Sequence, residues 1–77
     1  MGITDDIADE LAIEALKLEE RTGDDKVVTK ISEILGASSQ TTQEAYLTSV
    51  RVRRAEKRAR DYLAEMKETL DQDATPN

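Results

Sequence analysis

Residues 42–71 determine the architecture of this chain. They read TQEAYLTSVRVRRAEKRARDYLAEMKETLD. No glycine or proline interrupts it before Pro76, so we expect one helix of about 30 residues and about 45 Å. Thr41 and Glu44 match a capping box at its start. Side chains spaced alternately three and four apart predict a heptad-like seam along this helix, with small residues in its middle and two leucines broadening its end: Ala45, Thr48, Val52, Ala55, Ala59, Tyr62, Met66 and Thr69, with Leu63 and Leu70.

A first helix is expected at about residues 4–21. Thr4 is a suitable N-cap, and Gly23 is suited to the left-handed conformation that ends many helices. Its expected buried stripe has helical spacing and includes three alanines: Ile7, Ala8, Leu11, Ala12, Ala15 and Leu18.

A second, shorter helix is expected at about residues 25–35. Asp24 is its predicted cap, and Gly36 is predicted to close it. Aliphatic residues at helical spacing predict its buried face: Val27 or Val28, Ile31, Ile34 and Leu35.

These patterns predict an all-α fold of three helices, in a single small helical domain over residues 1–71 with a disordered polar tail at 72–77. The first helix spans only about 27 Å and cannot cover the long helix along its whole length. A chain this short gains little stability from one core and usually needs staples or a partner. An apolar seam left exposed marks a partner surface, so we expect a helical-bundle dimer.

The composition excludes several kinds of chemistry. The 77 residues include no cysteine and no histidine, which excludes disulfides, thiol chemistry, a histidine base and a Cys/His metal site. Clusters of Asp and Glu are read as helix-capping and solvated groups. We therefore expect no catalytic residue, no bound metal, no cofactor and no small-molecule substrate. No apolar run could cross a membrane and no secretory leader is recognisable, so we expect no membrane association and a cytoplasmic protein.

Charge is unevenly distributed along this acidic chain of net charge −6. Residues 1–25 carry net −7, residues 26–50 are neutral, residues 51–60 carry net +5 and residues 61–77 carry net −4. The basic block is either a solvated face partly neutralised by the first helix, or a platform for an acidic protein or a nucleic-acid backbone. Its predicted charged partner surface consists of Arg51, Arg53, Arg54, Lys57, Arg58 and Arg60.

Residues 28–47, VTKISEILGASSQTTQEAYL, resemble the helix-turn-helix signature of DNA-binding regulators. Ile31 and Leu35 stand at the buried positions, Ser32 where close packing is needed, and Gly36 in the turn. The resemblance implies that polar residues after the turn read base edges, above all Gln40 and Gln43. It also implies phosphate contacts from basic residues farther along, which are Arg51, Arg53 and Arg54.

We therefore expect a non-enzymatic protein–protein interaction module: an adaptor, regulator or assembly factor that associates with a protein partner or with itself. Tyr46 and Tyr62 are expected in the seam, with hydroxyls reaching water. The alternative is a helix-turn-helix transcriptional regulator built on residues 28–47 and 51–60. The expected self-association residues share the seam of the long helix: Val52, Ala55, Ala59, Tyr62, Leu63 and Met66.

Overall fold

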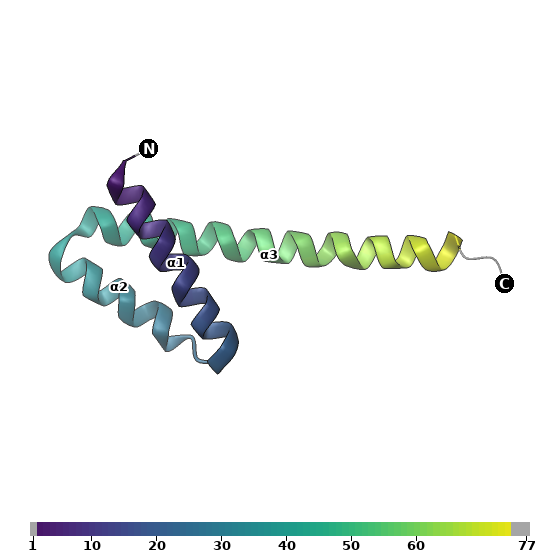
Figure 1. Ribbon diagram of the computed structural model, residues 1–77, viewed down its shortest axis with the longest axis horizontal. Helices are drawn as coiled ribbons and strands as arrows, with labels where there is room; N and C mark the ends of the chain where they lie inside the picture. Colours follow the sequence, from purple (N-terminus) through teal and green to yellow (C-terminus); the bar gives the residue numbers. More distant parts are fainter. Residues whose placement is uncertain (1, 75–77) are drawn as a thin grey trace.

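The computed structural model describes residues 2–74 as three helices (Figure 1). They are α1 (Ile3–Thr22), α2 (Lys26–Ser38) and α3 (Gln40–Ala74). The described residues contain no strand, so the predicted all-α class and the number of helices are confirmed.

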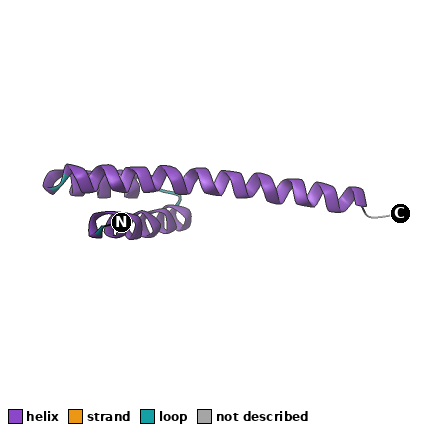
Figure 2. Ribbon diagram, turned by 90° about the horizontal axis from the view of Figure 1, so that it is seen from above, coloured by secondary structure: helices purple, strands orange, loops and turns teal. Residues whose placement is uncertain are grey.

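Helices α1 and α2 and the N-terminal part of α3 pack together, and we call this part the head. The C-terminal part of α3 projects from it and is called the projecting segment. Helices α2 and α3 lie in one layer, and α1 lies on one face of that layer, where it crosses α3 (Figures 1 and 2). The radius of gyration is 17.0 Å, against about 11–12 Å for a compact chain of this length. The C-terminal part of α3 accounts for the difference, because it extends past both other helices.

A row of alanines on α1 forms the centre of the core. Ala8, Ala12 and Ala15 are completely buried, and together with Val28 and Val50 they contribute to one cluster. Short side chains at this row let the helix backbones approach closely, and larger residues fill the flanks of the contact, among them Leu11, Leu16, Ile31 and Leu35.

The predicted stripe on α1 is thus partly wrong. Ile7 and Leu18 are 43% and 46% exposed, because the closest approach of α1 runs along its alanines and leaves these larger residues at the margin. On α2, Ile34 is 58% exposed. Ser32, which has a small side chain, is buried instead.

Tyr46 contradicts the sequence-based prediction most clearly. Its side chain is completely buried, and its hydroxyl donates a hydrogen bond to the main-chain carbonyl of Val28 over 2.9 Å. Burial raises the pKa of Tyr46 above its ordinary value. Tyr46 lies one helical turn before buried Val50, so it belongs to the core face of α3 and not to the predicted seam.

The first helix ends as predicted but begins earlier. Gly23 has φ of 73° and its N–H donates to the carbonyl of Glu19 over 2.7 Å, which is the expected left-handed stop. Thr4 is not the cap, because α1 begins at Ile3 and the capping position is Gly2. Thr4 therefore already lies inside the first turn.

The connection between α2 and α3 is tighter than the sequence indicated. Helix α2 continues through Gly36 to Ser38, and Ser39 alone separates it from α3. The Ser39 hydroxyl accepts a hydrogen bond from the N–H of Thr42 over 3.1 Å. Ser39 thus caps α3 in place of the predicted Thr41, which lies within the helix.

The observed start of α2 and end of α3 both differ slightly from the predicted ones. The Asp24 carboxylate accepts the N–H of Lys26 over 2.9 Å, so Asp24 does bond the start of α2, although the residue directly before the helix is Asp25. Helix α3 runs to Ala74, three residues past its predicted end and into the predicted tail. The rest of that tail, residues 75–77, lies outside the described residues.

Candidate interaction surface

The predicted seam residues after Ser49 line one exposed face of α3, which we call the outer face. Val52 and Tyr62 are each 60% exposed, and Leu70 is 67% exposed. A stripe of apolar side chains in contact with water is a candidate interaction surface. The outer face consists of Val52, Ala55, Ala59, Tyr62, Leu63, Met66 and Leu70, all of them exposed.

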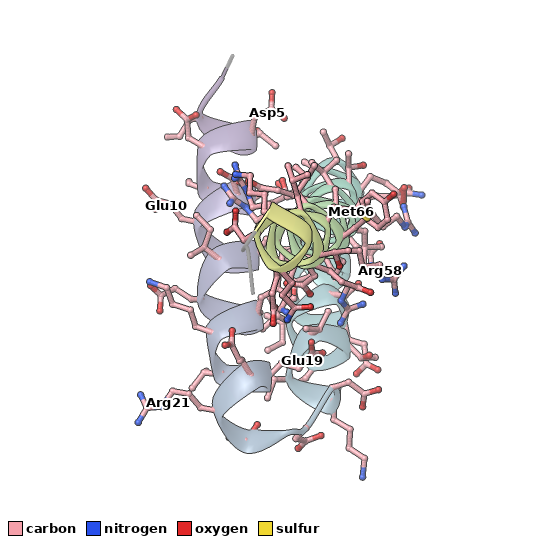
Figure 3. All side chains as sticks on the ribbon, turned by 90° about the vertical axis from the view of Figure 1, so that its right-hand side faces the viewer. Asp5, Glu10, Glu19, Arg21, Arg58 and Met66 are labelled. Carbon is pink, nitrogen blue, oxygen red and sulfur yellow. The ribbon has the colours of Figure 1, made fainter. Side chains whose placement is uncertain are left out.

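Helix α3 has two apolar faces that point in opposite directions. Buried Val50 and exposed Ala59 are nine residues apart, which is two and a half turns at 3.6 residues per turn. The face that packs into the head therefore lies opposite the outer face. Figure 3 looks along α3 and shows Met66 on the side of the helix away from α1.

Beyond the head, the continuation of the core face is polar. Lys57, Asp61 and Glu68 follow Val50 at positions close to whole helical turns, and all three are exposed. The apolar stripe thus changes sides along α3, from the core face in the head to the outer face in the projecting segment.

Two residues of the basic block pair with α1. Arg53 donates two hydrogen bonds to the Asp9 carboxylate, over 2.8 and 2.7 Å, and Arg54 donates to Glu19 over 2.7 Å. The hydrogen bond from Arg53 lowers the pKa of Asp9 and raises that of Arg53. These contacts fix where α1 crosses α3, since each joins a different turn of α1 to adjacent residues of α3.

Among the described side chains, the other four bases of the block form no ion pair with α1. Lys57 forms an ion pair with Asp61 over 3.1 Å, and Arg60 forms one with Glu56 over 2.9 Å. In each pair the two residues lie one turn apart within α3. Within residues 2–72, Arg51 and Arg58 form no ion pair. Of the six predicted charged-surface residues, these two alone remain for a partner, and they flank the outer face one heptad apart.

The two predicted base-reading residues are placed differently from each other. Gln40 is exposed at the start of α3. Gln43 instead donates from its amide to the carbonyl of Ser32 over 2.9 Å and packs over Gly36. Its side chain thus joins α3 to α2. The only sequence signal for this contact was a pair of small residues one turn apart, Ser32 and Gly36.

The described residues include a hollow on α1 and no cluster of metal-ligating side chains. In this part of the chain, no three His, Cys, Asp or Glu side chains are grouped to hold a metal ion. One hollow of about 480 Å³ is lined only by residues of α1, so no second element closes over it: Glu14, Lys17, Leu18, Glu20 and Arg21. None of the described helices is long and apolar enough to cross a membrane.

Comparisons with known proteins do not identify a relative. No protein-family model matches this chain, and neither the curated proteins nor the solved structures gave a similar protein.

Proposed function

We propose that this protein is a non-enzymatic helical interaction module that self-associates through the outer face of α3. The observation that carries this proposal is the opposition of Val50 and Ala59, which leaves a second apolar stripe outside the head. Burying the exposed half of one leucine side chain contributes roughly 1 kcal/mol. A pair of outer faces brings several such side chains together, including Leu63 and Leu70 from each copy.

The isolation of the projecting segment also favours a partner. Residues 61–72 are exposed on every side, and an isolated helix of this length is marginal in water. The pairs Lys57–Asp61 and Arg60–Glu56 are exposed i,i+4 pairs, which contribute only about 0.3–0.5 kcal/mol each. A second helix along the outer face supplies the tertiary packing that keeps such a segment helical.

Self-association gives the module its adaptor or assembly role. Acidic side chains of α1, among them Asp5 and Glu10, lie on the head, whereas Met66 of the outer face points away from α1 (Figure 3). A dimer would therefore present two such heads at fixed positions. Complementary charge on the heads and on the basic block would set the choice and orientation of further protein partners.

The test compares one substitution on each side of the projecting helix. Ala59→Asp would bury an unpaired carboxylate in the interface and should weaken the dimer about 100-fold or more. Ala64→Asp introduces the same charge on the polar side of α3 and should leave the dimer intact. Light scattering after gel filtration measures both masses. Equal dimerisation of the two variants would reject the outer face as the interface.

DNA binding is a second candidate, favoured by the unpaired exposed guanidinium groups of Arg51 and Arg58. Binding to random duplex at about 50 mM salt should then be detectable and should weaken steeply as salt rises. Replacing both arginines with Gln should weaken binding, whereas Arg21→Gln on the acidic α1 should not. Absence of any binding at this low salt concentration would exclude DNA as a ligand.

A further inference from the structure

We propose that two copies pair through their α3 helices in antiparallel orientation, with a two-fold axis close to Asp61. This inference rests on the proposed self-association and adds the direction and register of the two helices. Three properties of the outer face and its edges favour it: the distribution of net charge, the sequence of side-chain sizes, and the positions of the charged edge residues.

Net charge along α3 changes sign at Asp61. Residues 51–60 carry net +5 and residues 61–77 carry net −4. An antiparallel pair with its axis near Asp61 lays the basic segment of each copy along the acidic segment of the other. A parallel pair in register would place basic beside basic and acidic beside acidic, which costs free energy in two close helices.

Side-chain size along the outer face is also matched in the antiparallel orientation. With this axis, Ala59 faces Tyr62 of the second copy, and Ala55 faces Met66 of the second copy. Each small residue thus meets a large one, as close packing requires. In a parallel pair each residue meets itself, so the alanine layers would leave gaps and the Tyr62 layer would be crowded.

The edge of the outer face fixes the register. Arg51, Arg58 and Glu65 follow one another at seven-residue spacing along one edge of α3. When one helix is reversed, this edge meets the same edge of the other helix. With the axis near Asp61, Arg58 lies opposite Glu65 of the second copy, and the pair occurs twice. A shift by one heptad would place Arg58 against Arg58 or Glu65 against Glu65.

The parallel alternative offers a weaker set of charge contacts. It would bring Arg51 near Glu56 of the second copy, but Glu56 already accepts a hydrogen bond from Arg60 of its own chain. Arg58 would then face Leu63 and gain no partner.

The antiparallel pair also places the two heads at opposite ends of the dimer, with each projecting segment lying along the basic segment of the other copy.

A distance between two labels decides the orientation. The chain has no cysteine, so Gln72→Cys carries a single spin label outside the proposed interface. Pulsed electron resonance should give roughly 30–35 Å between labels in the antiparallel dimer, from 22 residues of separation along the axis. Two labels within about 15 Å of each other, as parallel helices side by side require, would overturn the orientation. A wild-type chain that stays monomeric would instead overturn the self-association itself.

A charge exchange tests the register separately. Arg58→Glu should weaken the dimer about tenfold, because two attractive pairs become repulsive. Adding Glu65→Arg to the same chain should restore dimerisation to near the wild-type level. A double variant that is no stronger than Arg58→Glu would overturn the register, and unchanged dimerisation of Arg58→Glu alone would do the same.

Discussion

Val50 and Ala59 lie on opposite faces of α3, the first buried in the head and the second exposed to solvent. Their separation of nine positions along the chain spans two and a half helical turns. One uninterrupted helix thereby has one apolar face packed against α1 and α2 and a second apolar face that its own chain leaves exposed. The core cluster of the head, with Tyr46, Val28 and the alanines of α1, includes no residue of the outer face.

Helix order in the projecting segment should depend on protein concentration. The side chains of residues 61–72 are all exposed, so dissociation of the dimer should increase fraying there. Hydrogen exchange of these amides should slow as concentration rises, while exchange around Tyr46 and Val50 should change much less. Protection of residues 61–72 that is independent of concentration would contradict a partner on this segment.

The buried hydroxyl of Tyr46 should contribute measurably to stability. Tyr46→Phe removes its hydrogen bond to the Val28 carbonyl and should lower the free energy of unfolding by about 1 kcal/mol. Tyr62→Phe is the control, because Tyr62 is 60% exposed. Both should be compared by urea unfolding in the Ala59→Asp background, where dimerisation does not enter. Equal losses for the two variants would argue against the buried bond.

The Asp9–Arg53 pair should make stability sensitive to acid. The hydrogen bond from Arg53 lowers the pKa of folded Asp9 below 3.8, so the unfolded chain takes up this proton first as pH falls. The pair's contribution is present above the unfolded pKa and is lost as pH falls through the lower folded value.

Asp9→Asn measures that contribution. Its deficit in unfolding free energy should be steady between about pH 5 and pH 7 and should shrink as the solution is acidified below pH 3.8. Glu10→Gln, at an exposed position beside it, serves as the control. A deficit that stays constant or grows in acid would show that Asp9 does not act through its charge.

Gly36 should be coupled to Gln43. A Cβ at position 36 would overlap the Gln43 amide and displace it from Ser32, costing a hydrogen bond of about 1 kcal/mol. The gain in helix propensity from Gly36→Ala is about 1 kcal/mol, so the two effects should nearly cancel in the wild type. In a Gln43→Ala background the same change should stabilise by about 1 kcal/mol. The same effect in both backgrounds would contradict the contact.

Local signals in the sequence were enough to predict the three helices and the outer face. The glycine stop at Gly23 and the uninterrupted run of α3 depend on residues close together in the chain. The exposure of Leu70, near the far end of α3, followed from comparing the lengths of the first and third helices. These features need no knowledge of how the helices cross.

The features that could not be predicted from the sequence depend on how the three helices pack across one another. Near the start of α3, Ala45 and Thr48 continue the seam, while Tyr46 and Val50 form an equally regular stripe on another face. Periodicity alone does not choose between them. Gly36 was ambiguous for a related reason, because glycine serves both as a helix stop and as a site of close approach. The ion pairs of Arg53 and Arg54 required the position of α1 along α3.

Self-association through the outer face of α3 underlies the proposed function. Sedimentation equilibrium of the wild-type protein over a wide range of concentration measures this self-association. We predict a mass that rises from that of the 8.6 kDa chain toward twice that value as concentration increases. A single species of 8.6 kDa at every concentration would contradict the claim.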